Sequence, residues 1–316
     1  MVTPLSSAPG KVRSEAIVLL AASLLLGASA PPFYRIAANL PPVQLSFLIS
    51  LVGTVGSGVL LAAYPGRSPF AIYARDRGQL VIVLAWGLGS FTLLVLALSA
   101  GTHSLSASLT ALIYRTWPLM LGLLAWAVLG ERYGRLGWVG LGIGFASVVG
   151  AYAWGGDLLF PARDLPLVGF IFLGAFGDAA AALSTRKYWP SNPLSFLFLC
   201  NAIALACFAA LGGGSVLEHL EALPGNDWFA MLFLGLAQNL GLTLLFIQSY
   251  RVVGSTAIVS LVYLASPFVT FVIDLVALRE PILPQYWLIA VGVLAGAVVM
   301  WLGQSQASRL RGSSAG

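Results

Sequence analysis

Long apolar runs separated by short polar gaps fill the chain from residue 15 to residue 304. A helix needs about 20 mostly apolar residues to cross the hydrocarbon core of a bilayer. The first run follows Lys11 and Arg13, as in a signal peptide, but the further spans behind it favour a helix that is retained. The pattern predicts ten transmembrane helices, at residues 15–38, 43–63, 79–99, 104–129, 134–154, 164–187, 193–212, 228–250, 254–278 and 285–304.

The second half of the chain repeats the first. Residues 79–154 align with residues 228–303 without a gap, at an offset of 149, and superpose three notable pairs: Tyr114 with Tyr263, Pro118 with Pro267, and Glu131 with Glu280. We therefore predict two five-helix units, residues 1–154 and 155–316. Because five is odd, the second unit enters the membrane from the opposite side. The predicted fold class is an all-α membrane protein of ten helices in two inverted repeats, typical of transporters with a substrate site between the halves.

Composition agrees with a protein that faces lipid. The mean hydropathy is +0.92 and only 9% of the residues are charged, whereas about a quarter are charged in a soluble domain. If the N-terminus is cytoplasmic, the cytoplasmic gaps hold twelve Lys and Arg residues and the outer gaps hold three. This positive-inside distribution predicts cytoplasmic N- and C-termini. It also explains the net charge of +5 without nucleic acid as a partner.

One cation interrupts the fourth predicted helix. Arg115 lies near its middle, and helical spacing puts it on a face of otherwise small or helix-bending residues: Ser104, Ser108, Ala111, Pro118 and Gly122. A lipid-facing Arg at that depth costs about 2.5–3.5 kcal/mol on insertion scales. Arg115 is therefore expected to face protein or a cavity and to need an anionic partner. Asp178, at a central depth in the sixth predicted helix, is the best candidate.

Three interpretations of Arg115 and Asp178 stay open. They form a structural ion pair that fixes helix packing. Alternatively, they flank a substrate cavity in which a zwitterion places its carboxylate on Arg115 and its ammonium on Asp178. In the third interpretation, Asp178 takes part in proton coupling, which makes protons a candidate partner.

Further residues are predicted to line the same cavity because they are polar or aromatic within apolar spans: Ser90, Phe91, Tyr114, Trp117, Gln238, Asn239 and Tyr263. Trp86 is another aromatic candidate, and Thr243 and Phe246 share a helical face with Asn239. The alternative for the Trp and Tyr residues is packing or anchoring at the membrane interface. Pro118 and Pro267 each remove a helix hydrogen bond, and their equivalent places in the repeat favour a pair of hinges over packing kinks.

Motifs for catalysis and for energy supply are absent from the sequence. The chain has no HExxH, no CxxC and only two His residues, so we predict no metal site. The lack of GxxxxGK[ST] argues against ATP-driven transport by this chain alone. We predict no cofactor and no enzymatic activity, with an intramembrane enzyme as the alternative from another class and a channel as a smaller one. The oligomeric state is left open.

Two segments carry a family resemblance. WPLMLGLLAWAVLGER at 117–132 and SPFVTFVIDLVALRE at 266–280 resemble the drug/metabolite transporter superfamily, EamA type. Within it, YRTWP at 114–118 and LGAFGDAAAALSTRKY at 173–188 are similar to bacterial exporters of aromatic amino acids. The resemblance implies a basket-shaped bundle in the bacterial inner membrane. It also implies export of amino acids or related metabolites by alternating access, with another small metabolite or a drug as the alternative cargo.

Overall fold

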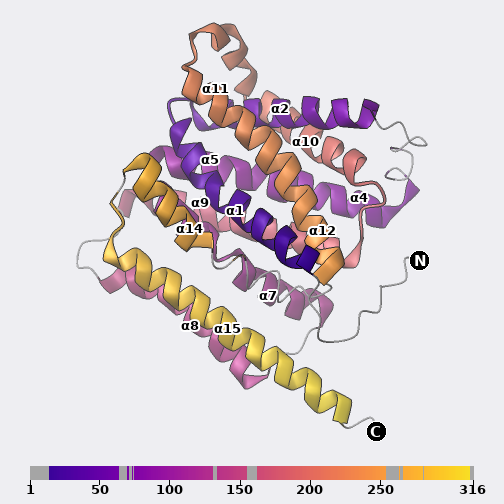
Figure 1. Cartoon of the computed structure of the whole chain (residues 1–316), viewed down its shortest axis with the longest axis vertical. Coiled ribbons are helices and arrows are strands. Elements are labelled where there is room, and N and C mark those ends of the chain that lie inside the picture. The colour runs from indigo at the N-terminus through magenta and orange to yellow at the C-terminus, as the bar shows by residue number, and fades with distance from the viewer. Residues whose placement is uncertain are drawn as a thin grey trace.

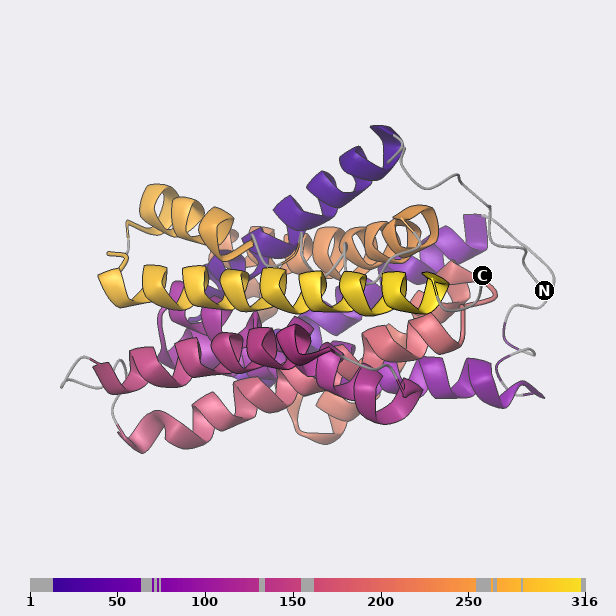
Figure 2. The same cartoon turned by 90° about the horizontal axis from the view of Figure 1, so that it is seen from below.

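The structure is a computed structural model that describes residues 14–63, 70, 73, 75–130, 134–154, 162–253, 263, 266–279 and 281–313. Within these residues the chain forms helices and turns and no strand, which confirms the predicted all-helical class. Figures 1 and 2 show a bundle in which α1 (Ser14–Ile36) begins and α15 (Pro284–Ser313) ends toward the same end. Glu131 and Glu280, paired by the sequence repeat, lie outside the described residues.

Seven helical stretches are long and apolar enough to span a membrane: Ile17–Ile36, Pro42–Ala63, Arg77–Ser104, Ala107–Leu129, Leu165–Thr185, Pro193–Ala210 and Gly225–Ser249. Two shorter apolar helices, Ser266–Leu278 and Pro284–Met300, follow them. The fifth predicted span corresponds to α8 (Arg135–Trp154), whose last side chains are outside the described set. The protein is a multi-pass membrane protein, and the total of ten spans remains a prediction.

Several spans consist of more than one helical element. The third contains α4 (Arg77–Leu84), η1 (Ala85–Leu94) and α5 (Val95–Ser104), and the eighth contains α11 (Gly225–Leu232), η4 (Phe233–Leu242) and α12 (Thr243–Val253). The ninth contains α14 (Ser266–Ile273) and η5 (Asp274–Leu278). The other elements are α2 (Pro42–Ala63), η2 (Ala162–Asp164), α9 (Leu165–Lys187), α10 (Pro193–Ala210) and η3 (Gly213–Ala222).

The boundary between the third and fourth spans differs from the prediction. The third span continues to Ser104, and the fourth begins only at Ala107. Leu105 is extended, and the Ser106 hydroxyl accepts a hydrogen bond from the backbone N of Leu109 at 3.2 Å, which caps the new helix. Ser104 therefore belongs to the helix before Arg115 and not to the Arg115 face.

The fourth span is broken at Arg115. Helix α6 (Ala107–Tyr114) ends just before it, and α7 (Trp117–Leu129) begins two residues after it. Pro118 is the second residue of α7, where a missing N–H costs no helix hydrogen bond. Pro267 is likewise the second residue of α14. The prediction that Pro118 removes a hydrogen bond within a helix is wrong, because it stands where α7 starts. For Pro267 the two residues before α14 lie outside the described residues. The role of both prolines as hinges stays a prediction.

The third and eighth spans share an unusual feature. Each contains a π-helical segment, η1 and η4, and the repeat offset of 149 places η1 within one residue of η4. In η1 the Thr92 hydroxyl donates to the carbonyl of Gly87, five residues earlier, at 2.7 Å. Such segments are rare and often lie at functional sites. Their matched places follow the sequence repeat.

Helices α8 and α15 pack side by side through glycines (Figure 1). A Cβ atom on Gly140 would lie 2.3 Å from the backbone N of Met300, and one on Gly303 would lie 2.4 Å from the backbone N of Gly137. Residue numbers therefore rise along one helix as they fall along the other, so the two helices are antiparallel. The sequence repeat makes α8 and α15 equivalent, so these equivalent helices run in opposite directions.

Helices α2 and α10, the second member of each predicted unit, are also antiparallel neighbours. A Cβ atom on Gly53 would meet the Asn201 side chain, and one on Gly58 would lie 3.4 Å from the Phe198 ring. Contacts among other elements are reciprocal as well, because α1 and α2 both contact η4 while α9 and α10 both contact η1. The two predicted units thus exchange partners with one another.

Tyr73 ties the segment between the second and third spans to the loop before α10. Its side chain is buried, and its hydroxyl donates to the carbonyl of Asn192 at 2.9 Å. Burial raises the pKa of Tyr73 to about 12, although the hydrogen bond to Asn192 opposes this rise. The neutral phenol is therefore the form that stabilises the folded protein.

The substitution Tyr73→Phe is expected to lower the free energy of unfolding by about 1 kcal/mol at neutral pH, because one hydrogen bond is lost. An unfolded tyrosine ionises near pH 10, whereas folded Tyr73 keeps its proton to about pH 12. The advantage of the wild type should therefore shrink as pH rises from about 10 to about 12. Thermal unfolding of both proteins in detergent across this range measures it, and a difference independent of pH would contradict the expectation.

Candidate functional site

A cavity of about 90 Å³ lies inside the bundle. Both predicted units contribute to its wall. The lining residues of the first unit lie between α1 and α7, and those of the second lie between α9 and Tyr263. The wall includes every residue predicted to line a cavity: Ser90, Phe91, Tyr114, Arg115, Trp117, Asp178, Gln238, Asn239 and Tyr263. The structure thus brings the predicted set together, and its role in substrate binding remains a prediction.

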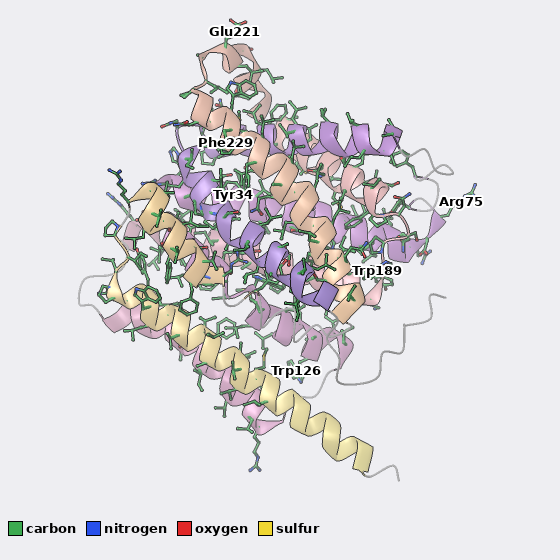
Figure 3. All side chains as sticks on the ribbon, in the orientation of Figure 1. Tyr34, Arg75, Trp126, Trp189, Glu221 and Phe229 are labelled. Atoms are coloured by element: carbon green, nitrogen blue, oxygen red, sulfur yellow. The ribbon has the colours of Figure 1, made fainter. Side chains whose placement is uncertain are left out.

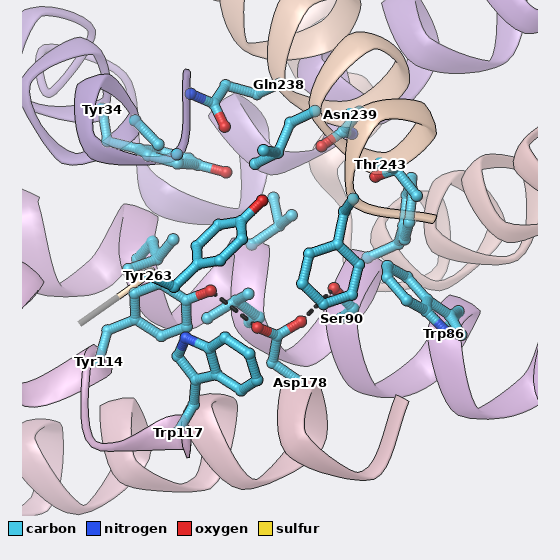
Figure 4. A pocket seen from close by; sticks show the side chains of 18 of the residues that line it. Tyr34, Trp86, Ser90, Tyr114, Trp117, Asp178, Gln238, Asn239, Thr243 and Tyr263 are labelled. Carbon is cyan, nitrogen blue, oxygen red and sulfur yellow. Dashed lines mark hydrogen bonds between the residues drawn. The ribbon is translucent and has the colours of Figure 1, made fainter. Parts of the chain in front are cut away.

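Asp178 is the anionic group of the cavity. Its Oδ1 accepts a hydrogen bond from the Ser90 hydroxyl at 2.7 Å, and its Oδ2 accepts one from the Tyr114 hydroxyl at 2.7 Å (Figure 4). Helix α9 comes close enough to η1 for this contact because glycines meet there: a Cβ atom on Gly89 would lie 2.6 Å from the carbonyl O of Gly177. Asp178 is only partly buried, so its carboxylate borders the cavity while neutral hydroxyls hold both oxygens.

Arg115 lies within the wall and is not paired with Asp178. Its Nη2 donates to the carbonyl O of Gly27 at 2.6 Å, and its guanidinium carbon is 4.8 Å from the centroid of the Tyr114 ring. The residue is 2% exposed. The part of the chain that the structure describes holds no carboxylate oxygen within 4.0 Å of Arg115. The interpretation as a direct ion pair is therefore wrong: Ser90 and Tyr114 donate to the two Asp178 oxygens, and Arg115 Nη2 donates to Gly27 instead.

Aromatic rings form the apolar part of the wall. Phe246 is at the centre of this group, with ring centroids 5.4 Å from Tyr263, 5.8 Å from Trp86 and 6.2 Å from Trp117, all in edge-to-face geometry. The Trp86 indole N–H donates to the Thr185 hydroxyl at 2.7 Å, which fixes its ring. Edge-to-face pairs at these separations are favourable beyond the area they bury. Figure 4 shows Trp86, Trp117 and Tyr263 around the Asp178 carboxylate.

The two amides on η4 face the cavity and also join helices. Gln238 donates from Nε2 to the carbonyl O of Leu26 in α1. Asn239 donates from Nδ2 to the Asn201 side-chain oxygen at 3.2 Å, and Asn201 donates to the carbonyl of Leu197 at 2.9 Å. The π-helical segment is thereby tied to α1 on one side and to α10 on the other. These amides hold the cavity wall together as well as lining it.

The wall also contains residues outside the predicted set. Most are small or apolar: Gly27, Ala30, Leu94, Val95, Leu98 and Leu242. An apolar residue within an apolar helix gives no sequence signal for its direction, so these could not be found. Tyr34 is different, because its hydroxyl within the first apolar run was a usable signal. It lies inside the bundle, whereas Arg75 and Glu221 are at the periphery (Figure 3).

The cavity offers groups for non-covalent binding. One carboxylate, several hydroxyls, two amides and a set of aromatic rings face it. Among the described residues, no three His, Cys, Asp or Glu side chains are grouped so that they could hold a metal ion. The arrangement suits a molecule that is cationic at one end and apolar or aromatic over the rest, since anions and aromatic faces both attract cations.

Comparisons with known proteins agree with this architecture. Residues 13–153 match the family model described as the EamA-like transporter family. No curated protein matches the chain. Solved structures do match, and one of them, described as the crystal structure of a protein, has a TM-score of 0.57 and 19% sequence identity over 93% of this chain and 99% of its own. The fold is thus shared with a solved protein, and residues 13–153 are similar to the EamA-like transporter family.

Proposed function

We propose that this protein is a transporter that exports amino acids with bulky, above all aromatic, side chains across the bacterial inner membrane by alternating access. The observation that carries the proposal is the cavity between the two predicted halves, where the Asp178 carboxylate lies among aromatic rings. Intramembrane charges are costly and mark substrate or ion pathways by default. The similarity of residues 13–153 to the EamA-like transporter family supports transport as the activity.

Alternating access is supported by the arrangement of the helices. The repeat-equivalent pairs α2 with α10 and α8 with α15 are antiparallel, as two halves inserted in opposite directions require. The cavity lies where the broken fourth span and the two π-helical segments meet. Broken helices at a repeat interface are the usual elements of transporter sites. Because α1 begins and α15 ends toward one end of the bundle (Figure 2), we propose that both termini are cytoplasmic.

The proposed cargo follows from the two kinds of group in the cavity wall, a carboxylate and a set of aromatic rings. An ammonium group would bind the Asp178 carboxylate, which is held by Ser90 and Tyr114. A ring would pack among Trp86, Trp117 and Phe246. The cavity of about 90 Å³ has room for several waters at roughly 10–15 Å³ each, so admitting an aromatic amino acid requires the halves to separate, as alternating access provides.

Transport by the purified protein in liposomes tests this proposal. We expect labelled Phe, Trp and Tyr to exchange faster than through empty liposomes, and labelled Gly and Asp to remain at the empty-liposome rate. A drug or another metabolite that moves while the three aromatic amino acids do not would overturn the cargo but leave transport in place. Chemical conversion of a solute, with no movement of any, would favour an intramembrane enzyme.

A further inference from the structure

The two ionisable side chains of the cavity, Asp178 and Arg115, differ in their access to a ligand. Asp178 is partly exposed, and its two hydrogen bonds come from the neutral hydroxyls of Ser90 and Tyr114. A carboxylate has about four acceptor positions, so both oxygens keep capacity for a further donor. Neutral donors leave the negative charge in place. Asp178 thus offers the cavity a whole charge and unused acceptors.

Arg115 has fewer groups that a ligand in the cavity could reach. It is 2% exposed, and its guanidinium is bonded to the Gly27 carbonyl and lies against the Tyr114 ring. Glycine at position 27 leaves room for the neighbouring Tyr263 ring, because a Cβ atom there would lie 3.3 Å from it. A bidentate grip on a ligand carboxylate needs two adjacent N–H groups free. The Gly27 carbonyl takes one N–H of Nη2, and Nε, which has no hydrogen-bond partner in the described structure, is buried out of reach of a ligand.

The aromatic wall adds attraction for a cation. The rings of Tyr114, Trp117 and Tyr263 stand near the Asp178 carboxylate (Figure 4), and Trp117 contacts both Phe246 and Tyr263. A cation is attracted to the negative face of an aromatic ring, and the attraction is stronger when both are desolvated. A ligand carboxylate gains nothing from these faces, because the faces are themselves negative.

We infer that the cavity recognises the ammonium and the ring of its substrate and does not require the carboxylate. The substrate class is then organic cations with an aromatic or bulky apolar group, of which the aromatic amino acids are one case. This inference rests on the proposed function, since it concerns the same site. It departs from the zwitterion hypothesis, in which Arg115 binds the carboxylate.

Inhibition of labelled Phe exchange in liposomes shows whether the ammonium or the carboxylate of the ligand is recognised. Phenylalanine amide and phenethyltrimethylammonium keep the cation and lack the carboxylate, whereas 3-phenylpropionate keeps the carboxylate and lacks the cation. We expect the two cations to inhibit within about threefold of unlabelled Phe and 3-phenylpropionate to be at least about tenfold weaker, since one lost charge contact is worth more than 1.4 kcal/mol. Inhibition by 3-phenylpropionate alone would overturn the inference.

Direct uptake of labelled phenethyltrimethylammonium gives an independent readout, because its fixed charge prevents passive entry. We expect uptake above empty liposomes by the wild type and at least a tenfold loss in Asp178→Asn. If Phe does not exchange but this cation enters, the amino acid assignment fails and the present inference stands. If Phe exchanges and the cation neither enters nor competes, the inference fails and the proposed function stands. If neither solute moves, both fail.

Discussion

Replacing Asp178 by asparagine is expected to lower Phe exchange at least about tenfold while leaving the amount of folded protein unchanged. Asn has nearly the same shape, and its side-chain oxygen still accepts from Ser90 or Tyr114, which both donate to Asp178. What it lacks is the charge that pairs with the substrate ammonium. Removing one partner of a buried, hydrogen-bonded charge pair costs about 2–5 kcal/mol, and each 1.4 kcal/mol is about tenfold. Initial exchange rates over a range of Phe concentrations measure the loss.

A matched control is available on the surface of the protein. Asp76 is exposed and caps α4 by accepting a hydrogen bond from the backbone N of Gly78 at 2.8 Å. Asn caps a helix as well as Asp does, so Asp76→Asn makes the same chemical change without loss of the cap. Its exchange rate should equal that of the wild type. Wild-type exchange in Asp178→Asn would remove the charge of Asp178 from the mechanism.

The sequence could identify the cavity residues because charge and polarity within apolar helices are expensive. Arg115 was found by that cost, Asp178 as its candidate partner, and Tyr114, Gln238 and Asn239 as polar or aromatic residues within apolar spans; all of them line the cavity. The energetic cost of a buried charge does not indicate which group will interact with it. Arg115 contacts the Gly27 carbonyl through Nη2 and the Tyr114 ring, while its Nε has no partner in the described structure. A backbone carbonyl leaves no trace in a side-chain pattern.

Backbone irregularity was the other feature beyond prediction. Apolar periodicity described the fourth span as one helix, because residues on both sides of Arg115 are equally apolar. The break between Tyr114 and Trp117 and the two π-helical segments depend on how neighbouring helices satisfy freed backbone groups. The sequence repeat, in contrast, could be recognised from the sequence. Tyr114 and Pro118 have the same spacing as Tyr263 and Pro267, and such a match stands out in a chain that is otherwise uniformly apolar.

The substitution Gly140→Ala is expected to destabilise the protein by about 1–3 kcal/mol, the usual cost of overpacking. The new Cβ atom would lie 2.3 Å from the backbone N of Met300 and 2.4 Å from the carbonyl O of Gly296. Both are main-chain atoms, so no side chain can turn aside and α8 must move away from α15. A lower midpoint of thermal unfolding in detergent, with more aggregated protein on size exclusion, would record this.

Gly142→Ala is the matched control, because Gly142 is two residues away on the exposed side of α8 and a Cβ atom there would meet nothing within 4 Å. In a helix interior Ala is favoured over Gly by about 1 kcal/mol, so this variant should be as stable as the wild type or slightly more so. Equal midpoints for the two variants would contradict the packing argument. Because α8 and α15 come from different predicted halves, a loss confined to Gly140→Ala would mean that backbone contact between equivalent helices holds the halves together.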